Sequence, residues 1–83
     1  MRLEKALSDF LIHQGQFDHA LNIFHTMASM PSEYRTSIVS DWAQIKKRAK
    51  INGYKQLSSR LSQLLLELSS FFLLAYNRPL DFL

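Results

Sequence analysis

Three histidines are the side chains of this sequence best suited to bind a metal ion: His13, His19 and His25. Two histidines that share a metal on one helix usually stand four residues apart, so that both rings project from the same face. These three follow one another at intervals of six residues, and each step turns the side chain by about 240° around a helix axis. The spacing therefore does not predict a metal site, and we expect solvated or helix-capping histidines and no bound metal.

Catalysis by acid and base needs two ionisable groups held together, and nucleophilic catalysis needs a serine or cysteine in an activating context. The seven acidic residues are scattered along the chain, only Glu67 stands among apolar residues, and there is no cysteine. The serines lie in no nucleophile-elbow motif, and no glycine-rich phosphate-binding loop is present. We therefore predict that the protein is not an enzyme and has neither catalytic residues nor a cofactor.

Positive charge is concentrated in the middle of the chain, on Lys46, Lys47, Arg48, Lys50, Lys55 and Arg60. Cations in the last turns of a helix are stabilised by its negative dipole end, so we expect a solvated helix terminus here. A patch of cations can also bind the phosphates of a nucleic acid. The net charge is only +3, however, and no helix-turn-helix pattern accompanies the cluster, so nucleic-acid binding is kept as an alternative only.

The length of 83 residues and the absence of cysteine limit how this chain can be stabilised. A core of this size supplies about 3–5 kcal/mol unless disulfides, metals or a partner add to it. The start of the chain is charged and lacks the apolar run of a signal peptide. The most apolar segment, residues 64–76, is shorter than the roughly 20 residues that cross a bilayer. We expect a cytoplasmic protein without a membrane span that associates with other proteins as a hetero-oligomer.

Two glycines and two prolines divide the sequence into segments whose apolar residues recur at helical spacing. No segment alternates with the period of two that a half-buried strand requires. We therefore predict a single all-α domain over residues 1–83. Its four expected helices span residues 3–14, 17–29, 32–52 and 54–76.

The last of these helices carries more apolar residues than one buried face can hold. Its regular stripe, which we expect to face the core, consists of Leu57, Leu61, Leu64, Leu65 and Leu68. Further apolar residues lie outside this stripe in the second half of the helix, namely Leu66, Phe72, Leu73 and Leu74. We predict that these four residues bind a protein partner and that Trp42, although a core residue, also lines the binding groove.

The stretch from residue 15 to residue 31 resembles a tetratricopeptide repeat. The resemblance is carried by Gly15, Phe17, Ala20, Phe24 and Pro31, whose relative offsets match those of the repeat except that the proline comes one residue early. Such a repeat is an antiparallel helical hairpin, which implies a turn at Gly15 and a tetratricopeptide-like fold of stacked hairpins. A lone repeat cannot bury both of its faces, so the resemblance also implies that something else covers it.

Roughly residues 10–66 resemble the C-terminal half of the small tetratricopeptide-like chaperones that hold the needle subunit of bacterial type III secretion systems. The matching residues are Trp42, Gly53, Leu57, Ser59, Arg60, Leu61 and Leu64. The resemblance implies a non-enzymatic cytoplasmic chaperone. It would bind an amphipathic helix of the needle subunit together with a small helical co-chaperone and thereby prevent premature polymerisation.

A competing resemblance is to the C-terminal mitofilin domain of the mitochondrial inner-membrane organising protein. It is carried by Gly15, Phe17, Asp18, Ala20, Arg35, Asp41 and Trp42. This sequence begins without the coiled coil and the transmembrane segment that precede that domain, so we take a mitofilin-like interaction domain as the alternative.

Overall fold

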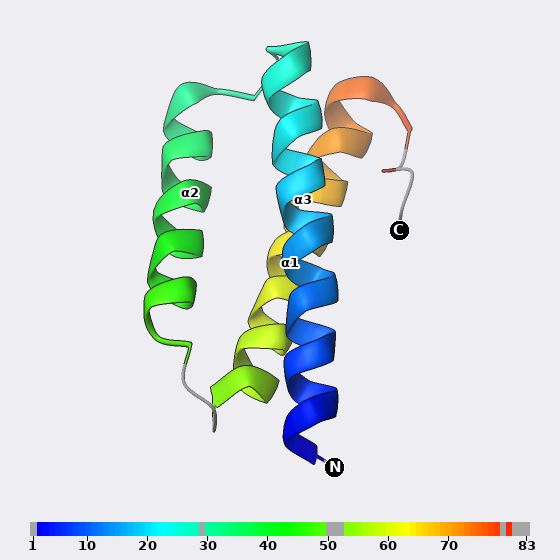
Figure 1. The fold of residues 1–83 in the computed structure, drawn as a ribbon. Helices are drawn as coiled ribbons and strands as arrows, with labels where there is room; N and C mark the ends of the chain where they lie inside the picture. The colour runs from blue at the N-terminus through cyan, green and yellow to red at the C-terminus, as the bar shows by residue number, and fades with distance from the viewer. Residues whose placement is uncertain (1, 29, 50–52, 79, 81–83) are drawn as a thin grey trace.

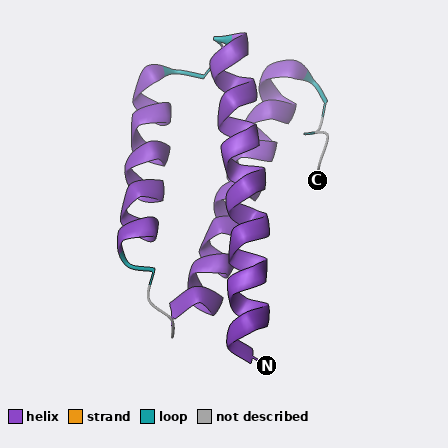
Figure 2. Ribbon diagram, in the orientation of Figure 1, coloured by secondary structure: helices purple, strands orange, loops and turns teal. Residues whose placement is uncertain are grey.

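The computed structural model describes residues 2–28, 30–49, 53–78 and 80. The described residues form three helices, α1 (Arg2–Met27), α2 (Ser32–Lys47) and α3 (Tyr54–Tyr76). No strand occurs in these ranges (Figure 2). The predicted all-α class is therefore confirmed, with three helices in place of the four expected.

The helices are arranged up, down and up. α1 and α3 lie side by side and run in the same direction, whereas α2 runs the opposite way beside them (Figure 1). Ring contacts fix this order, because Phe10 near the start of α1 lies 5.2 Å from the ring of Tyr54 at the start of α3. Phe24 near the end of α1 lies 5.5 Å from Phe72 near the end of α3.

The prediction of a turn at Gly15 is wrong, because α1 continues through this residue as one helix of 26 residues. Neither described glycine has a positive φ, and Gly15 is exposed with no atom within 4 Å of the position that a Cβ would take. A glycine inside a helix costs about 0.5–1 kcal/mol. That cost is small beside the burial of Phe10 and Phe17, which lie on one stripe on either side of Gly15.

The ends of the helices agree in part with those predicted from the glycines and prolines. α1 ends where Ala28 takes a left-handed conformation with φ 52°, and α2 begins directly after Pro31. α2 ends at Lys47, earlier than expected, and the predicted closing residue Asn52 lies outside the described residues. α3 keeps its predicted bounds and is closed by Asn77, whose φ is 57° and whose N–H donates to the carbonyl oxygen of Leu73 at 2.7 Å.

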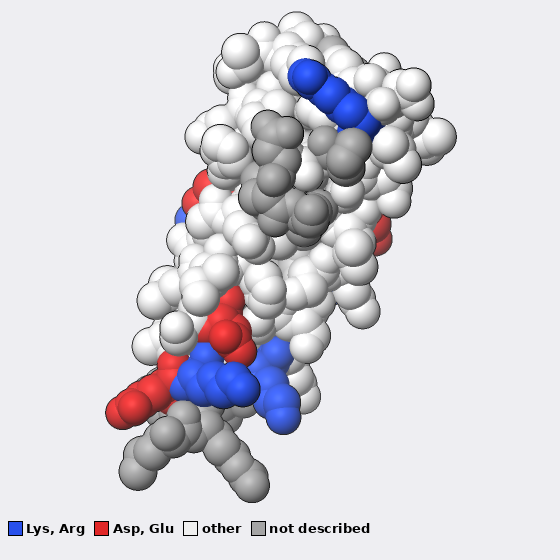
Figure 3. All heavy atoms as spheres, turned by 90° about the vertical axis from the view of Figure 1, so that its right-hand side faces the viewer, with Lys and Arg blue, Asp and Glu red and all other residues white. Residues whose placement is uncertain are grey.

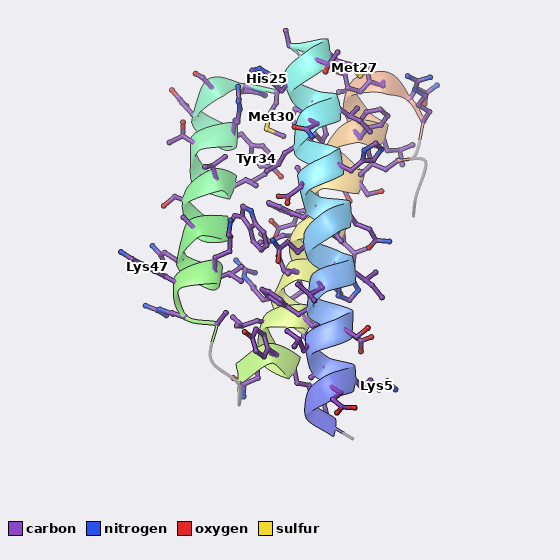
Figure 4. The ribbon with its side chains drawn as sticks, in the orientation of Figure 1. Lys5, His25, Met27, Met30, Tyr34 and Lys47 are labelled. Atoms are coloured by element: carbon purple, nitrogen blue, oxygen red, sulfur yellow. The ribbon has the colours of Figure 1, made fainter. Side chains whose placement is uncertain are left out.

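One apolar core joins the three helices. α1 contributes a phenylalanine every seven residues, at positions 10, 17 and 24, and α2 contributes Ile38, Trp42 and Ile45. The α3 stripe is buried as predicted at Leu61, Leu64, Leu65 and Leu68, while Leu57 is half-buried. Figure 4 shows Met30 and Tyr34 pointing toward α1 while Lys47 points away from the bundle.

Candidate partner-binding surface

Several large apolar side chains remain exposed on the described part of the chain: Leu7, Leu11, Ile12, Val39, Leu66, Leu73 and Leu74. Three of the five residues predicted to bind a partner are among them, because Leu66, Leu73 and Leu74 all face solvent. The other two are not on the surface. Phe72 and Trp42 are buried in the core, so in this structure they support the fold and do not line a groove.

Leu66 and Leu73 share one face of α3, since seven residues make almost two full turns. They are 62% and 48% exposed. Small hydroxyl side chains accompany them on this part of α3: Ser59, Ser62, Ser69 and Ser70. Leu74 is 88% exposed but is turned by about 100° from Leu73, so it belongs to a different strip of the helix.

Ile12, on α1, lies on the same side of the bundle as Leu66 and Leu73. His13 contacts α3 and Phe17 contacts Trp42 of α2. Helical geometry therefore places Ile12 beyond His13, on the side of α1 that faces away from α2. The same reasoning on α3 places Leu66 and Leu73 beyond Ser62, which contacts His13, again on the side away from α2. We call Ile12, Leu66 and Leu73 the seam patch, because they flank the line along which α1 and α3 meet.

Among the described residues, the side of the molecule that carries the seam patch shows few charged atoms (Figure 3). Most of the charged atoms visible from this side gather near the end where α1 begins. Lys5, Asp9 and Lys55 line a hollow with Ala6 at that end. A partner that covered the described α3 residues around Leu66 and Leu73 on this side would therefore desolvate mainly apolar and hydroxyl groups, which is the favourable case for association.

A polar cluster joins α1 to α3 beside the seam patch. His13 Nδ1 lies 2.7 Å from Ser58 Oγ, and His13 Nε2 lies 3.2 Å from Ser62 Oγ. Ser62 already donates its only hydroxyl proton to the carbonyl oxygen of Ser58, at 3.1 Å. We therefore assign the ring proton to Nε2, which donates to Ser62, while the hydroxyl of Ser58 donates to Nδ1.

This cluster is a cross-link between helices and does not have the features of a nucleophilic site. Ser58 is buried, and a catalytic serine needs access to substrate together with donors aimed at a developing oxyanion. The sequence-based interpretation missed the role of His13. The available signal was its position between Phe10 and Phe17 on the apolar stripe of α1. His19 and His25 are exposed, and no group of three or more potential metal ligands occurs in the described ranges.

The basic cluster is divided between α2 and α3. Lys46 places its ammonium 5.3 Å from the centre of the Trp42 ring. Arg60 approaches Asp41 at 3.6 Å, and both side chains are largely open to solvent, so this ion pair contributes little stability. Arg48 and Arg60 line a shallow hollow between the two helices, and Lys50 lies outside the described residues.

One tyrosine between α2 and α3 has an altered acidity. Burial raises the pKa of Tyr34, and the neighbouring carboxylate of Glu67 raises it further. The ring of Tyr34 stacks on Phe71 with 5.2 Å between the centroids. Glu67 itself is exposed, so the apolar surroundings that its sequence neighbours suggested are not found.

In the described part of the chain, no helix has both the length and the hydropathy needed to span a bilayer. Comparison with protein-family models, with curated proteins and with solved structures yields no significant match to this chain.

Proposed function

We propose that this protein is a non-enzymatic protein-binding module that holds an amphipathic helix of another protein against the seam patch. The observation that carries the proposal is the exposure of Ile12, Leu66 and Leu73 on a side with little charge. Exposed apolar patches on small soluble domains commonly mark sites of protein association.

The geometry of the seam patch suits a helix better than an extended strand. Leu66 and Leu73 are seven residues apart on one helix, a rise of about 10.5 Å. An amphipathic helix presents its own apolar residues at intervals of three, four and seven, so its anchors repeat with the same period. Added along the seam, such a helix would complete a four-helix bundle with α1, α2 and α3.

The narrower proposal names the partner as the needle subunit of a type III secretion system, bound together with a small co-chaperone. It rests on the sequence resemblance at Trp42, Gly53 and Leu57. A subunit whose apolar helix face is covered cannot use that face for polymerisation, so capture alone would account for a chaperone function. The mechanism requires no cofactor and no tetratricopeptide turn at Gly15.

The test is co-purification from the native cell with wild-type chain and with two charged variants, Leu66→Asp and Leu73→Asp. We expect both variants to keep wild-type helicity by circular dichroism and to lose a helical partner that the wild-type chain recovers. Val39→Asp is the matched control, because Val39 is also an exposed apolar residue but lies on α2. Retention of the partner by both α3 variants, or its equal loss from the Val39 variant, would contradict the proposal.

The identity of the recovered molecule separates the alternatives. A secretion needle subunit supports the narrower proposal, whereas mitochondrial inner-membrane organising proteins support the mitofilin-like alternative. Nucleic acid would instead point to the basic cluster. Binding to phosphates weakens steeply between about 50 and 200 mM salt, whereas binding at the seam patch should respond little.

A further inference from the structure

One strip of α3 has the residue spacing of a helix that packs along another helix. Its members follow one another at intervals of three and four residues: Ser59, Ser62, Leu66, Ser69 and Leu73. Such intervals return each side chain to nearly the same face of a helix. Three members are exposed, two are half-buried and none is charged. We call this line of side chains the serine–leucine strip.

The hydroxyl groups of the strip can be covered at little cost. Ser59 donates its hydroxyl proton to the carbonyl oxygen of Lys55 at 3.3 Å, and Ser62 donates to that of Ser58 at 3.1 Å. Both donors therefore keep a partner when water is removed, whereas the burial of a polar group is expensive mainly when its partner is lost. The two leucines of the strip gain from burial.

We propose that the serine–leucine strip pairs with the same strip of a second copy of this chain, with the two α3 helices antiparallel about a two-fold axis at Leu66. In this register Leu66 meets its counterpart, and Leu73 lies over Ser59 of the second copy. At both ends of the strip a large side chain thus faces a small one, which allows the helices to approach closely. The inference goes beyond the proposed function and does not rest on it.

Charge favours the antiparallel direction over the parallel one. Lys55 stands on the same face of α3, eleven residues before Leu66, which is about three turns. In the antiparallel register it lies opposite Asn77 of the second copy, where α3 ends and the helix dipole is negative. The last turn of α3 has no basic residue of its own. In a parallel pair the two Lys55 ammonium groups would instead face and repel each other.

Ile12 adds α1 to the same contact. It neighbours His13, which contacts Ser58 of α3, so Ile12 lies level with the Ser59 end of the strip. Leu73 of the second copy, placed over Ser59, therefore also approaches Ile12. One symmetric interface covers the whole seam patch, so a second copy and the helix of another protein compete for the same surface.

The size of the strip sets the strength of the pairing. From its first residue to its last the strip is about 21 Å long. A standard stable interface covers about 800 Å² on each partner, which is more than a single strip of this length offers. We therefore expect a dimer that dissociates on dilution and that a disulfide can trap at high protein concentration.

Introduced thiols report the register, because the chain has no native cysteine. Full chains carrying Ser59→Cys and full chains carrying Leu73→Cys are purified, checked for wild-type helicity by circular dichroism, and mixed under mild oxidation. The antiparallel register predicts a disulfide between the two different chains. Thiols on two like chains are then about 21 Å apart, which is too far for a bond.

Leu74→Cys is the matched control, because Leu74 adjoins Leu73 and is more exposed but belongs to a different strip of α3. We expect Ser59→Cys to form a disulfide with Leu73→Cys at least about 10-fold faster than with Leu74→Cys. Equal rates would mean random collision and would overturn the proposal. Faster bond formation between like chains would overturn it as well, because it would indicate a parallel pair.

This experiment separates the dimer from the proposed function, because it uses the purified chain alone. A rapid disulfide between positions 59 and 73 supports the dimer even if no helical partner is recovered from the cell. Its absence overturns the dimer even if a partner is recovered.

Discussion

At the scale of single residues, Leu61 and Leu66 contrast because they stand on one helix and differ chiefly in burial. Leu61 is fully buried, whereas Leu66 is mostly exposed. We expect Leu61→Ala to lower the free energy of unfolding by about 2–5 kcal/mol, because it removes buried methyl groups and leaves a cavity. Leu66→Ala should change it by less than about 0.5 kcal/mol.

Chemical denaturation monitored by circular dichroism measures both values. A loss of stability for Leu66→Ala comparable to that of Leu61→Ala would mean that Leu66 is packed within the free chain. The seam patch would then not be available to a partner.

Tyr34 gives a prediction of pH dependence. Its pKa is raised in the folded state by burial and by Glu67, so the folded protein holds the phenolic proton more tightly than the unfolded chain does. Stability from this group is therefore fully present below the ordinary tyrosine pKa of about 10, and it is lost as pH rises through the higher folded value.

We expect the melting temperature to fall above about pH 10 and to fall less steeply in Tyr34→Phe. Tyr54→Phe is a useful control. Tyr54 is also a half-buried tyrosine packed against the core, but it lies at the start of α3, whereas Tyr34 packs near the end of that helix. If the melting temperature falls equally steeply with rising pH in the wild-type chain and in Tyr34→Phe, the raised pKa of Tyr34 is not the cause of the fall.

At the scale of elements, α1 and the turn after it place two small residues in unfavourable conformations. Gly15 lies inside a helix in open space, and Ala28 has a positive φ, which disfavours residues with a Cβ. Gly15→Ala and Ala28→Gly should each raise the free energy of unfolding by about 0.5–1 kcal/mol. The first removes a flexible glycine from a helix, and the second supplies a glycine where φ is positive.

Thermal or chemical unfolding of the two variants also tests the continuity of α1. If the chain turned at Gly15 with a positive φ, Gly15→Ala would destabilise the protein. If α1 instead continued straight through position 28, a glycine there would weaken the helix, so a destabilising Ala28→Gly would contradict the turn at that position.

The helical class and the buried stripe of α3 could be predicted from the spacing of apolar residues. The start of α2 and the bounds of α3 could be predicted from the proline, glycine and asparagine residues that flank them. The turn predicted at Gly15 does not form, because the phenylalanines that repeat every seven residues across it are buried as one helical stripe. The contact between His13 and Ser58 joins residues 45 positions apart, and no local pattern reports such a pairing.

Part of the candidate surface could also be predicted from helical periodicity. Helical periodicity identifies Leu66 and Leu73 as lying off the buried stripe, and both are exposed. Phe72 was predicted to lie off the buried stripe, but it follows Leu68 by four residues and Leu61 by eleven, so helical spacing places it on the stripe. It is buried there and contacts Phe24 of α1.

At the scale of the whole molecule, a small core coexists with an apolar patch on its surface. We expect the isolated chain to self-associate as its concentration rises, because a second copy can cover the seam patch where charges are few. Sedimentation velocity over a range of concentrations measures this association. Leu66→Asp should suppress it, whereas Val39→Asp should not, and a wild-type chain that stays monomeric throughout would contradict the expectation.

The direct packing of the first helix against the last has a consequence for the order of events during synthesis. α1 makes most of its helix contacts with α3, so a nascent chain that ends before residue 54 offers its phenylalanines the ring of Trp42 on α2 but none of the α3 leucines. Isolated helices gain most of their stability from such packing, and α1 and α2 alone should remain poorly ordered. Folding should therefore begin only as α3 leaves the ribosome, and a partner that acts before then meets an unfolded segment and not a bundle.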